Sequence, residues 1–254
     1  MRLAGVVVCL MAAASGVAAQ SSADLIALGD AAYKARRPQD ALEQYTRAIA
    51  ADAANYEALW KASRSEVDLA EIAPNRPALD ALAAAGQRHA EAAIRVRPAD
   101  AEGHFSLARA LGRRALSVGV RDGIRLAGVI RDEALAALAI NSTHPGALHV
   151  LGMWNAEILR INGLSRLFAR TFLGARVFSL ASWDEAQRLM EASVQHDPGR
   201  IVHRLDLAGI YADRGDRTRA RELYLWIGSA PLVDPNDDLY KRQAAERLSR
   251  LPRN

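Results

Sequence analysis

A pattern of small and large residues that repeats along the chain is the feature that most constrains its fold. Over residues 22–55 the pattern occupies Leu25, Leu28, Gly29, Ala32, Ala41, Tyr45 and Ala48. The same register returns over residues 201–236 at Leu207, Ala208, Tyr211, Ala220 and Tyr224. Small side chains at these spacings let neighbouring helices approach closely, so each stretch predicts a pair of packed helices. A chain of such pairs forms a solenoid.

Three longer units fill the space between these two stretches. The units start near residues 22, 56, 101, 145 and 201. The fourth unit contains a whole extra helix over about residues 164–173, and a last amphipathic helix over 238–251 suits a solenoid cap with a polar outer side. This 34-residue pattern resembles the tetratricopeptide repeat. The prediction is an all-α, right-handed tetratricopeptide-like solenoid of about five helix pairs, forming a single domain over residues 20–254.

Composition agrees with a folded helical protein. Of 254 residues, 50% are hydrophobic, 24% are charged and only 6% are aromatic, which excludes a disordered chain and favours helix over strand. The formal net charge is +4, but the charges are mixed and scattered, so a nucleic acid is not expected as a partner. The one cysteine, Cys9, lies in the N-terminal apolar run, so disulfides and thiolate metal sites are not expected in the mature chain.

The N-terminus has the layout of a secretory signal peptide. Arg2 precedes an uncharged run that ends in small residues at Ala19. This pattern predicts a signal peptide over residues 1–19, cleavage that leaves Gln20 first, and an exported protein that is periplasmic or secreted. Retention of the run as a membrane anchor is the alternative.

Several short segments carry a family resemblance. They read Ala-Leu-Gly-Arg, His-Pro-Gly-Ala-Leu-His-Val-Leu-Gly-Met-Trp-Asn-Ala-Glu, Leu-Ser, Phe-Leu-Gly and Ser-Trp-Asp-Glu-Ala, at residues 110–113, 144–157, 164–165, 172–174 and 182–186. Over about residues 100–250 the chain resembles the regulator of microtubule dynamics family. The resemblance implies a helical-repeat fold without catalytic activity and, in eukaryotic members, association with microtubules or organelle contact sites. A microtubule-regulating role is therefore the alternative if the chain is not exported.

Motifs for catalysis or metal binding do not occur in the sequence. His144 and His149 are five residues apart, whereas two metal ligands on one helix need a spacing of four. We therefore predict a turn residue at His144, a groove residue at His149, and no cofactor, metal or catalytic residue. An envelope enzyme or enzyme subunit that uses the enlarged fourth unit, near Glu157, is the rival interpretation.

Two further features admit two interpretations each. Four tryptophans could form a ligand cage or pack between helices: Trp60, Trp154, Trp183 and Trp226. The inserted helix has an apolar side bordered by arginines, so it could cover an end of the core or lie on a membrane surface as a tether. Its apolar residues are Leu164, Leu167, Phe168 and Phe172.

Residues on the concave face of a solenoid are the candidates for partner binding. In tetratricopeptide domains the first helices of successive units line this face, and here their inward positions carry Tyr33, Lys34, Trp60, Arg64, Phe105, Arg109, Arg113, His149 and Met153. Arg64, Arg109 and Arg113 are expected to form a cationic track beside flat aromatic surface, which suits an extended acidic peptide. An ordinary solvated face, with Arg64 paired to Asp68, is the alternative. The predicted function is a non-catalytic scaffold or adaptor that binds a protein or peptide in the cell envelope.

Overall fold

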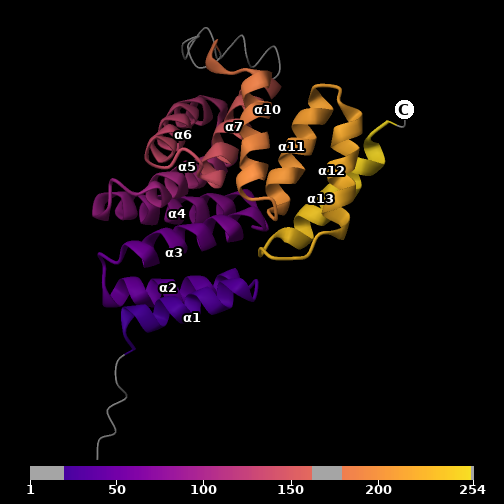
Figure 1. The fold of residues 1–254 in the computed structure, drawn as a ribbon. Helices are drawn as coiled ribbons and strands as arrows, with labels where there is room; N and C mark the ends of the chain where they lie inside the picture. The colour runs from indigo at the N-terminus through magenta and orange to yellow at the C-terminus, as the bar shows by residue number, and fades with distance from the viewer. Residues whose placement is uncertain (1–19, 162–178, 253–254) are drawn as a thin grey trace, which may run out of the picture.

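The computed structural model describes residues 20–161 and 179–252, and these ranges form eleven α-helices without a β-strand (Figure 1). The helices are α1 (Ser22–Lys34), α2 (Pro38–Ala51), α3 (Tyr56–Glu71), α4 (Arg76–Val96), α5 (Ala101–Ala115), α6 (Val120–Ile140), α7 (Pro145–Arg160), α10 (Trp183–His196), α11 (Ile201–Asp213), α12 (Arg217–Ser229) and α13 (Asp237–Arg250). The all-α prediction is confirmed.

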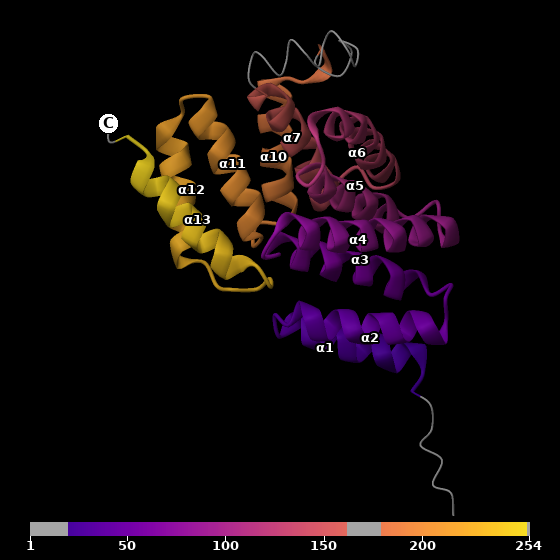
Figure 2. The same ribbon diagram turned by 180° about the vertical axis from the view of Figure 1, so that it is seen from behind.

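The helices pack as consecutive pairs stacked in series. The pairs are α1 with α2, α3 with α4, α5 with α6, α7 with α10, and α11 with α12, and α13 packs against the last pair (Figures 1 and 2). This arrangement confirms the predicted solenoid of helix pairs. First helices of successive pairs also contact one another, so α1, α3, α5, α7 and α11 form the inner layer. The helix expected over residues 164–173 lies outside the described residues.

Local sequence explains where the helices begin. Ser21 and Asp24 form a reciprocal capping box at α1, and the Asn55 side chain caps α3 by accepting from a backbone N–H. Pro145 stands in the first turn of α7, where its missing N–H costs nothing. His144 lies just before it, and its Nδ1 accepts from the Ala147 N–H at 3.1 Å, as the expected turn position requires.

Close approach between paired helices explains the small residues of the repeat. A Cβ atom added at Gly29 would overlap the ring of Tyr45, a fully buried side chain on α2. A Cβ atom at Gly152 would lie 2.7 Å from Cγ of Met190 and 3.3 Å from the Ala186 carbonyl oxygen on α10. These glycines therefore let a large side chain of the second helix pack against the first helix backbone.

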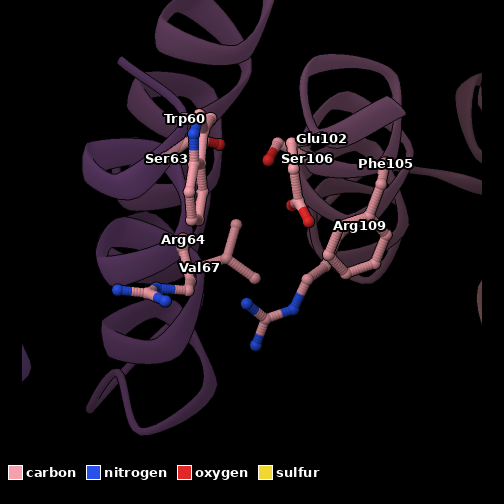
Figure 3. Close-up of a pocket in the computed structure, with 8 residues that line it drawn as sticks. All are labelled: Trp60, Ser63, Arg64, Val67, Glu102, Phe105, Ser106 and Arg109. Carbon is pink, nitrogen blue, oxygen red and sulfur yellow. The ribbon is translucent and has the colours of Figure 1, made fainter. Parts of the chain in front are cut away.

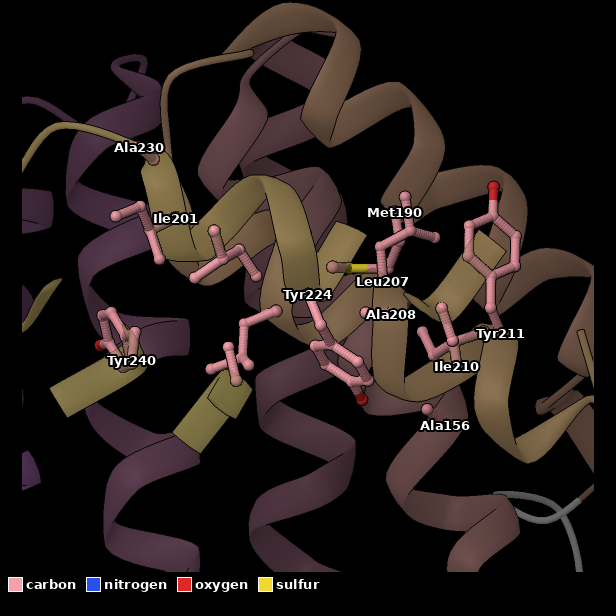
Figure 4. Packing of buried hydrophobic residues seen from close by; sticks show 14 of the residues in the cluster. Ala156, Met190, Ile201, Leu207, Ala208, Ile210, Tyr211, Tyr224, Ala230 and Tyr240 are labelled. Carbon is pink, nitrogen blue, oxygen red and sulfur yellow. The ribbon is translucent and has the colours of Figure 1, made fainter. Parts of the chain in front are cut away.

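The apolar core is divided into clusters along the array. The first cluster joins α1, α2 and α3 around Leu25 and Tyr45. The last and largest joins α7 with α10 to α13 around Met190, Ile201 and Tyr224 (Figure 4). These two clusters share no residue, so the described ends of the solenoid are not joined by a common apolar core.

The two ends nevertheless meet, because the array curves until the loop before α13 lies beside α3 (Figure 2). The Asn236 side chain donates from Nδ2 to the Asp68 carbonyl oxygen at 2.9 Å. Arg36, after α1, pairs with Asp238 at 2.8 Å. We call residues 234–240 the closing segment, since they bring the C-terminal end of the chain onto the concave face. None of the described helices is long and apolar enough to cross a membrane.

Candidate partner-binding site

A small pocket lies between the first helices of the second and third pairs (Figure 3). Its lining residues are Trp60, Ser63, Arg64, Val67, Glu102, Phe105, Ser106 and Arg109. Four of the nine predicted groove residues are among them. Trp60 and Phe105 stand on opposite sides, and the Glu102 carboxylate lies between the two helices (Figure 3).

The Phe105 wall of the pocket is held in place by α7. A Cβ atom at Gly146 would overlap the Phe105 ring, so that ring packs directly on the start of α7. The same ring lies 4.8 Å from the His144 ring, centroid to centroid. His144 Nε2 in turn lies 3.2 Å from Glu102 Oε1. These contacts limit the movement of Phe105 and Glu102.

Two polar atoms of the lining residues are buried without a hydrogen-bond partner in the described structure, Ser63 Oγ and Arg64 Nε. Ser63 has no exposed surface at all. A buried polar atom left unbonded costs about 1–3 kcal/mol, so native proteins rarely keep one without a reason. Both residues also line the pocket.

Arg64 is the cation of the pocket that has no acidic partner among the described residues. Its guanidinium stacks 3.6 Å from the centre of the Tyr33 ring, and it donates to the Tyr45 hydroxyl at 3.3 Å. Residues 20–161 and 179–252 place no carboxylate within 4.0 Å of it, so the pairing with Asp68 considered from the sequence does not form. Stacking holds the guanidinium in a fixed plane and leaves its charge uncompensated.

Arg109 and Arg113 are already bonded inside the protein. Arg109 Nη2 lies 2.5 Å from Oδ1 of Asp68, and Asp68 also accepts from the Tyr33 hydroxyl at 2.7 Å. Arg113 pairs with Glu71 at 3.1 Å. Burial raises the pKa of Tyr33 above its usual value, so its hydroxyl stays a donor. Of the expected cationic track, Arg64 is therefore the member that the described residues leave unpaired.

The remaining predicted residues lie away from the pocket. Lys34 is exposed at the end of α1, and Met153 packs against the C-terminal core cluster. His149 Nε2 lies 2.9 Å from Oδ2 of Asp206, and its ring stacks at 4.7 Å on that of His203. His144 and His149 thus have different partners. No group of three residues able to hold a metal ion occurs in ranges 20–161 and 179–252.

The tryptophans are dispersed along the array. Trp154 is buried and donates from Nε1 to the Ala127 carbonyl oxygen at 2.7 Å, Trp183 packs on the C-terminal cluster, and Trp226 stacks with Arg204 at 4.0 Å. Trp60 is the member of the four that lines the pocket. Packing between helices therefore describes the other three, and a cage of four tryptophans does not form.

Sequence reasoning missed two groups of residues in this region. Ser63, Glu102 and Ser106 line the pocket beside the residues that were expected. Asp68, considered only as a partner of Arg64, and Glu71 neutralise Arg109 and Arg113. Their positions four and seven residues after Arg64 place them on the same face of the helix, a pattern that is visible in the sequence. The closing segment carries no periodic signal, because its position depends on the curvature of the whole array.

Structural comparison supports the repeat assignment. The chain matches the crystal structure of TTC0263, a thermophilic tetratricopeptide protein of Thermus thermophilus, with 16% identity, a TM-score of 0.66, and coverage of 90% of this chain and 100% of that chain. It also matches YrrB, a tetratricopeptide protein with an unusual peptide-binding site, with 15% identity, a TM-score of 0.43, and coverage of 90% and 92%. At 16% identity, the likeness to TTC0263 concerns the fold alone. A comparison with curated proteins finds no significant match.

A family model covers nearly the whole described chain. The model for regulator of microtubule dynamics protein 1-3 matches residues 24–252, from the first turn of α1 to the end of the cap. The helix pairs, the cap and the match over this length agree with one another. The chain therefore belongs to the regulator of microtubule dynamics protein 1-3 family.

Proposed function

We propose that this protein is a non-catalytic scaffold that binds an extended segment of a partner protein across α3 and α5. Helical-repeat folds of this kind are typical of protein-binding scaffolds, which use the concave layer of first helices. The observation that carries the proposal is the pocket between Trp60 and Phe105, with buried polar atoms left unbonded beside it in the described structure. A side chain of a partner would fill the apolar space between the two rings.

The residues around the pocket define the chemistry of that partner. The faces of Trp60, Val67 and Phe105 fit an apolar side chain, which gains stability by leaving water. The unpaired guanidinium of Arg64 fits a carboxylate next to it. An acidic partner therefore stays part of the proposal, but it now rests on Arg64, because Asp68 and Glu71 already neutralise the other two arginines.

Peptide selection tests this function. A random peptide library is selected on the full-length protein, and the dissociation constants of selected peptides are measured by fluorescence anisotropy. We expect peptides with a large apolar residue beside an acidic one. Trp60→Ala and Arg64→Glu should each weaken their binding by about tenfold or more, equivalent to about 1.4 kcal/mol.

The matched control is Arg219→Glu on α12, an arginine that is half exposed and pairs with Asp216 away from the pocket. This variant should bind the selected peptides as the wild type does. Peptides that bind all variants equally would contradict the pocket as the binding site.

We also propose that this binding takes place in the cell envelope. The support is the predicted signal peptide over residues 1–19, which lies outside the described residues. Cell fractionation with N-terminal sequencing is the test, and a mature chain that begins at Gln20 and is free of membrane is expected. An intact Met1 end in the membrane fraction would contradict this location.

A further inference from the structure

Glu102 brings to the pocket a carboxylate that no lysine or arginine of the described residues neutralises. It lies in the first turn of α5, and its side chain is 39% exposed. Within residues 20–161 and 179–252, the basic side chain at ion-pair distance is His144, whose Nε2 lies 3.2 Å from Glu102 Oε1. The second oxygen, Oε2, accepts no hydrogen bond from the described residues. The carboxylate therefore has an oxygen free for a donor from outside.

The hydrogen bonds of His144 show that it holds this carboxylate without compensating its charge. His144 Nδ1 accepts from the Ala147 N–H at 3.1 Å, so the proton of the ring is on Nε2, which donates to Glu102. An imidazole with one proton is neutral. The same ring lies 4.8 Å from the Phe105 ring, centroid to centroid. His144 therefore fixes the apolar wall and the negative charge of the pocket together.

Arg64 supplies the opposite charge on the other side of the aromatic walls. Its guanidinium lies 3.6 Å from the centre of the Tyr33 ring on α1 and 5.2 Å from the centre of the Trp60 ring. Figure 3 shows this guanidinium pointing away from α5, whereas the Glu102 carboxylate lies toward α5. From α1 toward α7, the order is therefore a guanidinium, an aromatic pocket and a carboxylate.

This order matches the side chains of an extended segment that crosses the inner helices. Neighbouring packed helices lie about 8–10 Å apart. In an extended chain, side chains two residues apart point to the same side and are separated by about 7 Å. An apolar side chain in the pocket therefore places the side chains two residues before and after it near the two charges. A lysine is long enough to span the remaining distance.

We propose that Glu102 determines the specificity of the pocket by binding a basic side chain of the partner. This side chain stands two residues from the apolar one, on the side opposite to the acidic side chain that Arg64 attracts. The inference rests on the proposed peptide-binding function and deepens it. The partner segment carries one basic and one acidic residue that flank a large apolar residue.

Four labelled peptides of one length test this specificity on the full-length protein. Each has a central phenylalanine with serines beside it. Two carry one lysine and one aspartate at the flanking positions, in the two possible orders, as in Ser-Lys-Ser-Phe-Ser-Asp-Ser. The other two carry two lysines or two aspartates. Fluorescence anisotropy should give one of the mixed peptides a dissociation constant about tenfold lower than either peptide with like charges, because both of its charges meet opposite charges.

Charge reversal at Glu102 should invert this preference. With Glu102→Lys, the mixed peptide should bind about tenfold more weakly than to the wild type, and the peptide with two aspartates should become the tightest ligand. Glu102→Gln keeps an acceptor for His144 and removes the charge, so it should reduce the preference for the mixed peptide over two aspartates to less than about threefold. This variant keeps the test decisive if Glu102→Lys does not fold.

The matched control is Glu185→Lys. Glu185 also lies in the first turn of a helix, α10, and its side chain is 42% exposed and pairs with Arg188. The control should show the peptide preference of the wild type, which separates a local contact from a change in net charge.

Trp60→Ala separates failure of this inference from failure of the proposed function. Peptides that need Trp60 but bind the wild type and the folded Glu102 variants with the same preference would overturn the role of Glu102 and leave the pocket as the binding site. A preference that Glu185→Lys inverts as well would also overturn that role. Binding that does not depend on Trp60, or no binding by any of the four peptides, would overturn the inference together with the proposed function.

Discussion

The two ends of helices α3 and α5 differ in what lies over them. At the N-terminal ends, Trp60 and Phe105 flank a pocket that is open to solvent. At the C-terminal ends, Asp68 and Arg109 are bonded to each other beneath the closing segment. The open half is built by neighbouring units, whereas the covered half is reached by residues far away in the sequence. In this solenoid, contacts between residues far apart in the sequence decide which part of the concave face a partner can reach.

The difference between the two halves also predicts which substitutions affect stability and which affect ligand binding. Residues of the covered half are buried partners in a network, so removing one leaves another unsatisfied. Residues of the open half border the pocket on one side, so truncating a partly exposed one leaves fewer buried groups unsatisfied. Substitutions in the two halves should therefore have opposite signatures in folding and in ligand capture.

The largest effect is expected for Asp68→Ala. This change leaves the Arg109 guanidinium and the Tyr33 hydroxyl without their acceptor in a region where Asp68 is only 4% exposed. Removing one partner of a buried ion pair costs about 3–5 kcal/mol. Urea denaturation measures the loss. Glu102→Ala in the open half, where the Glu102 side chain is 39% exposed, should cost no more than about 1 kcal/mol. Similar losses in both variants would contradict the contrast between the halves.

The next effect concerns Gly146→Ala, which tests how the open half is built. The new Cβ atom would overlap the Phe105 ring and push it toward the pocket. Overpacking of this kind costs about 1–3 kcal/mol, and the displaced ring should weaken peptide capture as well. Gly112→Ala on α5 is the control, because a Cβ atom there meets nothing within 4 Å. An unchanged denaturation midpoint for Gly146→Ala would show that Phe105 is not held by α7.

His203 lies near the covered half and should make stability depend on pH. Burial, followed by the charges of His149, Arg200 and Arg109, lowers the pKa of His203 well below its usual value. Below about pH 6.5 the unfolded chain binds a proton at this site and the native chain does not, so stability falls as the pH falls. Between about pH 7.5 and 5.5 the loss is at most about 1.4 kcal/mol, the free energy of the proton that the unfolded chain takes up over that range.

Denaturation midpoints at several pH values measure this loss. His203→Gln should remove it, so the variant should lose less stability than the wild type over the same range. His196→Gln on the exposed end of α10 is the control and should leave the pH dependence unchanged. A His203→Gln variant with the pH dependence of the wild type would show that His203 does not stay neutral in the native state.

How far the sequence predicts this molecule depends on the range of the interactions. Gly29 opposite Tyr45 and Gly152 opposite Met190 follow from local spacing, since each pair lies within one repeat unit. Trp60 and Phe105 reach one pocket because they occupy equivalent positions in successive units. This part of the fold and of the candidate site could be predicted.

The other contacts of the site depend on alternatives between which the spacing of residues in the sequence cannot decide. Asp68 lies one helical turn after Arg64, yet it bonds Arg109 of the next unit, because the Arg64 guanidinium stacks on Tyr33 instead. The position of Asn236 beside α3 depends on the small rotation that each of five helix pairs adds. The total rotation is set by packing along the whole array, so no single segment of the sequence predicts it.

The smallest effect on stability is expected for Arg64→Ala, and it sharpens the comparison most. Arg64 stacks on Tyr33 at 3.6 Å but pairs with no carboxylate in the described structure, so its removal should cost only about 1 kcal/mol, the contribution of a partly buried cation–π contact. Its effect on binding should be larger, about tenfold or more, because the change deletes the unpaired charge that is proposed to attract an acidic partner. Lys34→Ala, at the exposed end of α1, is the matched control and should change neither quantity. A loss of stability at Arg64 as large as that at Asp68, with peptide affinity unchanged, would place Arg64 in the structural network and remove it from the binding site.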